Sequence, residues 1–257
     1  MTDAGVDSAE REQKMRIIII RHGDPDYSID SLTETGWKEA RLLAERLAKT
    51  DMTEIYVSPL GRAQDTLKPT LEKTGRTATT LEWLREFNPR INRPDVVGVR
   101  KLSWDWLPQD WTKDANFFDR NLWHTNPVFV EADVKKEYDW VIQNFDALLA
   151  EHGYVRDGDN YRVERPNRDT LVFVCHFGLE CVLLSRLMNA SPMVLWQGMC
   201  AAPSSFTSIY TEERREGIAS FRMSCFGDTS HLYAAGEEPS FAARFCETYD
   251  CAEERHD

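Results

Sequence analysis

The sequence predicts an α/β fold, with three layers (α/β/α) and a mostly parallel central sheet. Three short apolar runs support this prediction, at residues 15–20, 55–57 and 171–175. Such runs, rich in β-branched side chains, are typical of strands that are buried on both faces of a parallel sheet. Helical patterns separate the runs, and this alternation is the signature of a layered α/β domain.

The first run is followed by a polar loop and then by a predicted helix. Trp37, Ala40, Leu43 and Leu47 recur at helical spacing, with charged residues between them. Thr33 is a good candidate for the N-cap of this helix. A second helix is expected to follow residues 58–62 and to end near Lys73, where Gly75 suits a C-terminal stop. Residues 78–81 are a candidate third strand.

Residues 88–165 have a different character, being rich in both aromatic and charged side chains. We interpret them as a mainly helical insertion, with a helix near residues 134–150. Residues 153–168 are polar and contain Gly158 and Pro166, so they are expected to form a surface connection. The aromatic residues predict a small core for the insertion; they are Trp104, Trp106, Trp111, Phe117, Phe118 and Trp123.

The last third predicts a helix over residues 179–188 and then an antiparallel hairpin at the sheet edge. The hairpin strands are expected at residues 206–210 and 218–223, flanking a charged loop. The predicted organisation is a disordered leader (1–14), one α/β domain (15–235) with its insertion, and an acidic tail (236–257).

Charge and cysteine content narrow the function. The net charge of −12 argues against nucleic acid or an acidic membrane surface as a partner, although a few arginines in a cleft could still bind a small anion. The six cysteines include no C-x-x-C pair and predict free, buried thiols. The first fifteen residues lack the apolar core of a signal peptide, so we expect a cytoplasmic protein. Oligomeric state stays open, with a homodimer as one candidate.

Polar side chains follow three of the predicted strands. Arg21 and His22 end the first strand, residues 58–62 follow the second, and His176 follows the strand over 171–175. Ligand sites of open α/β sheets lie beyond the carboxyl ends of the strands, so these residues should converge. Arginine forks bind phosphate, and a neutral imidazole can attack phosphorus. The set therefore suits phosphoryl transfer.

These residues resemble the histidine phosphatase superfamily, in the branch that includes cofactor-dependent phosphoglycerate mutase. The matching motifs are Arg21-His22-Gly23, Leu32-Thr33-x-x-Gly36, Ser58-Pro59-Leu60-Gly61-Arg62-Ala63-x-x-Thr66, Leu84-Arg85-Glu86, and His176 after a strand.

The resemblance implies a role for each matching position. His22 would be the nucleophile that becomes phosphohistidine, and Arg21 and Arg62 would bind the phosphoryl oxygens. A cationic His176 would stabilise the same group, and Glu86 would act as general acid and then as general base. The resemblance implies no metal or other cofactor.

Further substrate contacts are expected from several weaker candidates. The backbone N–H groups of Phe177 and Gly178 lie at a predicted helix N-terminus. The side-chain candidates are Ser28, Ser205 and His231. Glu82 and Asp65 compete with Glu86 for the acid role, and His124 and His152 are interpreted as packing or surface residues.

The function predicted from the sequence is metal-independent hydrolysis of a small phosphorylated metabolite through a phosphohistidine. A phosphoglycerate mutase and a catalytically silent phosphate-binding module are the alternatives. The loop over residues 24–31 is shorter than its counterpart in the mutases, which disfavours that alternative. Asp24 and Asp26 would also repel a second phosphate if they faced the pocket.

Overall fold

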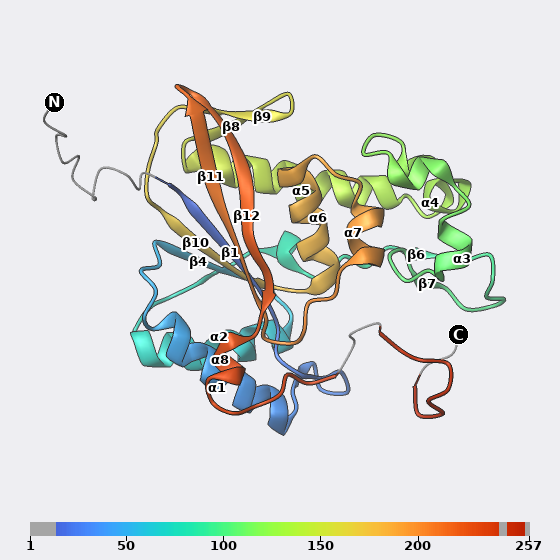
Figure 1. Ribbon diagram of the computed structural model, residues 1–257, viewed down its shortest axis with the longest axis horizontal. Coiled ribbons are helices and arrows are strands. Elements are labelled where there is room, and N and C mark those ends of the chain that lie inside the picture. Colours follow the sequence, from blue (N-terminus) through green and yellow to red (C-terminus); the bar gives the residue numbers. More distant parts are fainter. Residues whose placement is uncertain (1–13, 242–245, 255–257) are drawn as a thin grey trace, which may run out of the picture.

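The computed structural model describes residues 14–241 and 246–254. In these residues one sheet of eight strands runs through the middle of the molecule (Figure 1). In order across the sheet, the strands are β5 (Thr79–Thr80), β4 (Glu54–Val57), β10 (Thr170–Cys175), β1 (Arg16–Arg21), β11 (Phe206–Arg215), β12 (Ile218–Asp228), β9 (Asn160–Val163) and β8 (Tyr154–Asp157). The first four pair in parallel and the last four extend the sheet in antiparallel pairs.

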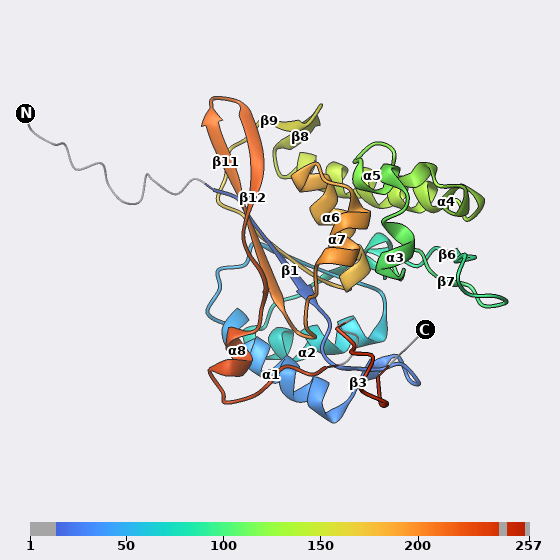
Figure 2. The same cartoon turned by 45° about the vertical axis from the view of Figure 1, so that its right-hand side comes forward.

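Helices cover both faces of this sheet, as Figures 1 and 2 show. One face carries α1 (Glu34–Leu47), α2 (Gly61–Thr74) and α8 (Ser230–Tyr233), and the other carries α5 (Val134–Glu151), α6 (Phe177–Met188) and α7 (Pro192–Gly198). The predicted three-layer fold is confirmed. The predicted helix ends are also confirmed, because Thr33 accepts a hydrogen bond from the Gly36 N–H and Gly75 ends α2 at a φ of 68°.

The parallel strands are buried because their side chains alternate between two hydrophobic cores. In β1, Ile17 and Ile19 belong to one core, whereas Ile18 and Ile20 belong to the other. All four isoleucines are fully buried. A run of β-branched residues without a polar member packs well between two helical layers.

The insertion does not form a core of its own. Trp104, Trp106, Phe117 and Trp123 are buried in the same cluster as the sheet residues on the α5–α6 face, whereas Phe118 is exposed. The shorter elements before and within the insertion are β2 (Pro25–Asp26), β3 (Ser31–Leu32), η2 (Glu82–Leu84), β6 (Arg90–Ile91), β7 (Lys101–Leu102), α3 (Pro108–Trp111), η3 (Ala115–Phe118), η4 (Trp123–Thr125) and α4 (Pro127–Glu131).

The prediction of a surface connection over residues 153–168 is wrong. The segment forms the β8–β9 hairpin, which pairs with β12 and makes one edge of the sheet. Although the segment is mostly polar, it contains two buried tyrosines, Tyr154 and Tyr161, whose rings pack against Phe221. Gly158 makes the turn at a φ of 55°. Both tyrosines therefore anchor this hairpin against β12.

The β11–β12 hairpin differs from its prediction in length and in place. Its strands run through the charged segment that was expected to be a loop, and only residues 216–217 remain as the turn. The charges are tolerated because they lie on the exposed extension, where Glu212 pairs with Arg222 at 2.6 Å. The hairpin is also internal to the sheet, since β11 pairs with β1 and β12 pairs with β9.

The predicted free thiols are found, although their burial varies. Cys175 and Cys181 are buried, Cys200, Cys225 and Cys251 are half-buried, and Cys246 is exposed. The predicted leader lies outside the described residues except for its last residue, as do parts of the acidic tail. Among the helices that the structure describes, none is both long and apolar enough to cross a bilayer.

Candidate active site

Strand register brings the predicted site residues together. Arg21 of β1 lies opposite Cys175 of β10, and the His22 N–H donates to the Cys175 carbonyl at 3.0 Å. His22 and His176 therefore follow neighbouring strands at the same edge, and their ring centroids are 5.1 Å apart. On the other side of β10, the Ser58 N–H donates to the Val174 carbonyl at 3.0 Å.

The backbone fixes the tautomer of His22. Its Nδ1 lies 2.8 Å from the Gly23 carbonyl oxygen, which can only accept a hydrogen bond. Nδ1 therefore carries the proton, and Nε2 keeps its lone pair. Burial lowers the pKa of His22 well below its usual value, and the nearby charges of Arg21 and Arg62 lower it further. His22 is thus a neutral imidazole with a nucleophilic Nε2.

The two arginines are held in different ways. Arg21 is 3% exposed and donates to the Ala201 carbonyl. Arg62 lies at the start of α2, where the helix dipole disfavours a cation. Asp30 compensates this, since its carboxylate accepts from Arg62 at 2.6 Å and from the Gly61 N–H at 2.7 Å. Asp30 was not predicted as a site residue, because only the folded loop brings it beside α2.

His176 bonds to a serine of the second motif. Its Nε2 lies 2.7 Å from the Ser58 hydroxyl, which also accepts from the Leu60 N–H at 3.2 Å. The surroundings of His176 disfavour the cationic form that was expected. Burial lowers its pKa well below the usual value, and His22, Arg62 and Arg21 add to the shift. A fully buried imidazole among cations stays neutral.

Glu86 is anchored at the N-terminus of α6. Its Oε1 accepts from the N–H groups of Phe87 at 2.8 Å and Leu179 at 3.0 Å. Burial nevertheless raises the pKa of Glu86 above its usual value, against the opposing effect of these bonds and of Arg62 and Arg21. The carboxyl group can therefore hold a proton. Glu82, by contrast, is exposed.

Gly178 makes room for this carboxyl group. A Cβ at Gly178 would lie 2.7 Å from Oε1 of Glu86 and 2.6 Å from Nε1 of Trp104. Position 178 therefore requires glycine because the Glu86 and Trp104 side chains lie close to its Cα. The α6 N-terminus already gives the Leu179 N–H to Glu86, and anion contacts from the N–H groups of Phe177 and Gly178 stay a prediction.

The other candidates lie farther out or in a second layer. Ser28 is exposed and bonds to Asp26, whereas Ser205 is buried beside β1, where its carbonyl accepts from the Arg21 N–H at 3.1 Å. His231 is 8% exposed and lies 3.2 Å from the Ser204 hydroxyl. The Ser204 N–H in turn donates to the His22 carbonyl at 3.0 Å.

The two remaining histidines have packing contacts. His152 bonds to the Tyr56 hydroxyl at 3.1 Å and to Asp169 at 2.9 Å, which agrees with its structural interpretation. His124 packs edge-on against Trp123.

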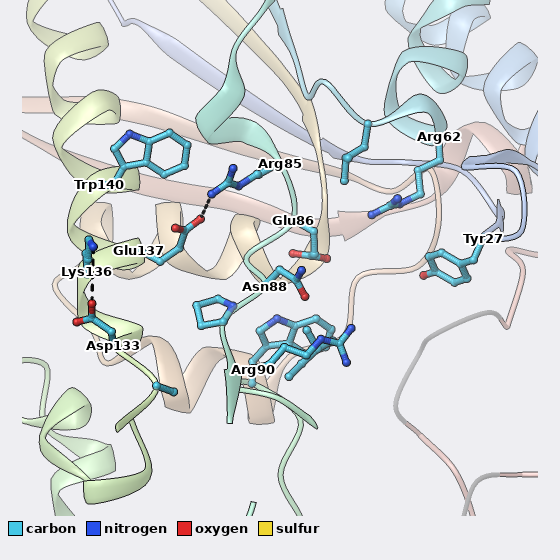
Figure 3. Close-up of a pocket in the computed structure, with 15 residues that line it drawn as sticks. Tyr27, Arg62, Arg85, Glu86, Asn88, Arg90, Asp133, Lys136, Glu137 and Trp140 are labelled. Carbon is cyan, nitrogen blue, oxygen red and sulfur yellow. Dashed lines mark hydrogen bonds and ion pairs between the residues drawn. The ribbon is translucent and has the colours of Figure 1, made fainter. Parts of the chain in front are cut away.

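A cavity of about 910 Å³ opens at Arg62 and Glu86 (Figure 3), and neither His22 nor His176 is among the residues that line it. Arg62, Glu86 and Tyr27 line it, whereas Asp24 and Asp26 do not, so the predicted repulsion of a second phosphate by these aspartates has no basis in this cavity. Asp24 instead accepts from the Thr33 and Ser240 hydroxyls. The remaining lining residues are Leu60 before α2, Arg85 after η2, and a set from the insertion: Asn88, Pro89, Arg90, Leu102, Trp104, Ala132, Asp133, Lys136, Glu137 and Trp140.

No three His, Cys, Asp or Glu side chains are grouped to hold a metal ion in residues 14–241 and 246–254. The groups that meet at the site are instead the two arginines, the Glu86 carboxyl group and two imidazoles whose pKa values are lowered by burial. Such a set can hold a tetrahedral anion and move a proton beside it.

Solved structures share this fold. A mycobacterial glucosyl-3-phosphoglycerate phosphatase is 21% identical with a TM-score of 0.53, covering 84% of this chain and 100% of its own. A phosphoserine phosphatase mutant from Entamoeba histolytica is 19% identical with a TM-score of 0.52, covering 85% and 99%.

Sequence comparison adds the family. Curated relatives named "Probable phosphoglycerate mutase GpmB", from Yersinia pestis and Yersinia pseudotuberculosis, are 34% identical over 102 residues, which cover 35% of this chain and 47% of theirs. The chain thus spans about half the length of these relatives. The model of the histidine phosphatase superfamily (branch 1) matches residues 17–118. Over these residues, which carry the Arg21-His22-Gly23 motif and Arg62, the chain is similar to the histidine phosphatase superfamily.

Proposed function

We propose that this protein is a phosphatase that hydrolyses a small phosphomonoester through a phosphohistidine at His22. The observation that carries the proposal is the neutral imidazole of His22, whose Nδ1 is bonded to the Gly23 carbonyl and whose pKa is lowered well below its usual value. Its free Nε2 lies beside the second imidazole and the two arginines. That arrangement is what attack on phosphorus requires.

In the first half-reaction, Nε2 of His22 forms a bond to phosphorus while the bond from phosphorus to the ester oxygen breaks. Arg21 and Arg62 hold the phosphoryl oxygens, where fixed cations stabilise the spread negative charge. Glu86, whose pKa is raised by burial, gives its proton to the leaving oxygen. The alcohol leaves, and the phosphoryl group stays on His22.

In the second half-reaction, water attacks the phosphohistidine. Glu86 is now a carboxylate and takes a proton from this water as the new bond to phosphorus forms. The bond from Nε2 to phosphorus breaks, inorganic phosphate leaves, and His22 returns as a neutral imidazole. Atoms and charge balance over the cycle without a further reactant.

The test is turnover of an aryl phosphate by purified protein in the presence of a metal chelator. Sustained release of the phenol supports a metal-independent phosphatase. No release with chelator, and recovery with an added divalent cation, would contradict the metal-independent mechanism. No release under either condition would contradict the phosphatase itself.

A mutase is the second candidate, because the curated relatives carry that name. A mutase would return the phosphoryl group from His22 to a different oxygen of the substrate. Phosphoglycerate isomerisation that depends on a bisphosphate primer and exceeds hydrolysis would favour it over the phosphatase.

We also propose that the reaction takes place in the cytoplasm and acts on a small metabolite. Cys175, Cys181, Cys225 and Cys251 are free thiols, which suits the reducing cytoplasm. The acidic net charge of −12 makes a small phosphorylated metabolite a more suitable partner than nucleic acid or a membrane.

A further inference from the structure

The cavity beside the active site carries cations of two kinds. Arg85 and Lys136 already have acidic partners, as the dashed lines in Figure 3 show. Arg85 pairs with Glu137 at 2.9 Å and lies over the Trp140 ring at 4.8 Å, and Lys136 lies 3.9 Å from Asp133. The charges of Arg85 and Lys136 are therefore largely compensated within the protein.

Arg90 is the exception. Within residues 14–241 and 246–254, no carboxylate forms an ion pair with it, and its guanidinium makes one long hydrogen bond, from Nη1 to the Arg100 carbonyl at 3.4 Å. It lines the same cavity as Arg62 and Glu86. In the view of Figure 3, Glu86, Asn88 and Arg90 lie between the α5 side chains and the side of Arg62 and Tyr27.

The backbone of Arg90 is fixed although its side chain is exposed. Arg90 belongs to β6 and pairs with Leu102 of β7, and the Arg100 guanidinium donates to the Arg90 carbonyl. Trp104, two residues after β7, is buried and donates from Nε1 to the Phe87 carbonyl at 2.7 Å. The side chain of Arg90 thus extends from a fixed backbone position on the cavity wall, and binding has to order only the side chain.

We propose that Arg90 binds a second anionic group of the substrate, so that the natural substrate is a phosphomonoester with another anion at its far end. This rests on the phosphatase function proposed above. Arginine binds carboxylate and phosphate through a planar fork of donors, and Arg90 keeps most of its donors available. In a protein with a net charge of −12, an uncompensated cation on a cavity wall marks a place for a negative group.

The cavity also offers apolar surface to the body of such a substrate. Leu102, Trp104 and Pro89 are among its lining residues and could contact a carbon chain or ring.

The experiment uses alkyl monophosphates of increasing chain length that end in a methyl group, a carboxylate or a second phosphate. Dissociation constants are measured by calorimetry on His22→Ala protein, and kcat/KM is measured on the otherwise unmodified enzyme. At the best chain length, the compounds with an anionic end should bind roughly tenfold to a hundredfold more tightly than the methyl series. The stronger of the carboxylate and phosphate arms identifies the anion.

Three variants separate a specific contact from general charge. Arg90→Gln should lose the preference for the anionic end, and Arg90→Lys should keep a smaller part of it, because the charge remains without the fork. Arg222→Gln removes the same charge from an exposed pair on β12 and should keep the full preference.

Equal affinity for all three series at every chain length would overturn the inference, as would an unchanged preference in Arg90→Gln. Turnover of the phosphates without any such preference would contradict this inference alone. Preference for the anionic end without turnover would contradict the phosphatase function alone. Failure of every compound to bind would overturn both.

Discussion

The rings of His22 and His176 are 5.1 Å apart although 154 positions separate them in the chain. Their distance follows from the parallel pairing of β1 with β10, which sets Arg21 opposite Cys175. Any phosphoryl group on Nε2 of His22 would therefore lie close to the second imidazole. The proposed chemistry depends on this pairing register of β1 and β10.

Replacement of Glu86 by glutamine should slow turnover by roughly a hundredfold to ten-thousandfold, because the leaving oxygen loses its proton donor. Vanadate or phosphate binding should change little, since the amide keeps an oxygen for the N–H groups of Phe87 and Leu179. The raised pKa of Glu86 means that the wild-type rate falls as pH rises through that pKa. Stopped assays across pH check this, and a variant with the wild-type pH profile and rate would move the acid role elsewhere.

Gly178→Ala should lower kcat by roughly tenfold to a hundredfold, because the new methyl group would displace Glu86 or Trp104. Gly198→Ala is the matched control, since a Cβ there has no neighbour within 4 Å. The control should be neutral or slightly stabilising. Equal kinetics for the two alanine variants would show that the tight contact has no catalytic consequence.

Ser58→Ala should lower both stability and kcat/KM. It removes the hydroxyl at 2.7 Å from Nε2 of His176 and leaves that buried nitrogen without its partner, at a cost of about 1–3 kcal/mol. Ser185→Ala is the control. Ser185 lies on α6, is also buried, and forms a hydrogen bond of 3.0 Å with the Tyr138 hydroxyl on α5. Thermal unfolding should shift in both variants, whereas kcat/KM should fall only in Ser58→Ala. A loss of activity of the same size in both would reduce Ser58 to a packing role.

Glu180 should make stability depend on pH. It is 1% exposed, and burial raises its pKa to about 7. A folded-state pKa above the unfolded value means that the stabilising effect is complete below the unfolded pKa and is lost as pH rises toward 7. Over that range the wild type should lose about 3 kcal/mol relative to Glu180→Gln.

Denaturant unfolding of both proteins at pH 5 and pH 8 measures this difference. Glu164→Gln is the control for the loss of one carboxylate at an exposed position. A constant difference in the free energy of unfolding between wild type and Glu180→Gln across pH would contradict the prediction.

Local sequence patterns predicted the elements that depend on local chemistry. The isoleucine run predicted β1, Thr33 predicted the start of α1, and Gly75 predicted the end of α2. Two interpretations of polar segments failed for a common reason. Residues 154–157, 160–163 and 211–215 lie in strands because cross-strand partners, such as Arg222 for Glu212, stabilise polar residues that no local pattern favours.

The motifs predicted the histidines and arginines of the site, but not the residues that hold those side chains in place. Asp30 contacts Arg62 only because the loop after β2 folds against α2, and Tyr27 lies over Arg62 at 5.4 Å for the same reason. Ser58 was visible in its motif, yet its bond to His176 depends on the pairing of β4 with β10. The neutral state of His176 follows from complete burial, which the sequence does not reveal.

The central claim is that His22 carries the phosphoryl group. The most direct measurement is a rapid-quench reaction with radiolabelled substrate, followed by peptide mapping of the denatured protein. We predict a label that survives alkali, is released by acid, maps to the peptide containing His22, and is absent from His22→Ala protein. Label on another residue, or full turnover by His22→Ala without a covalent intermediate, would contradict the mechanism.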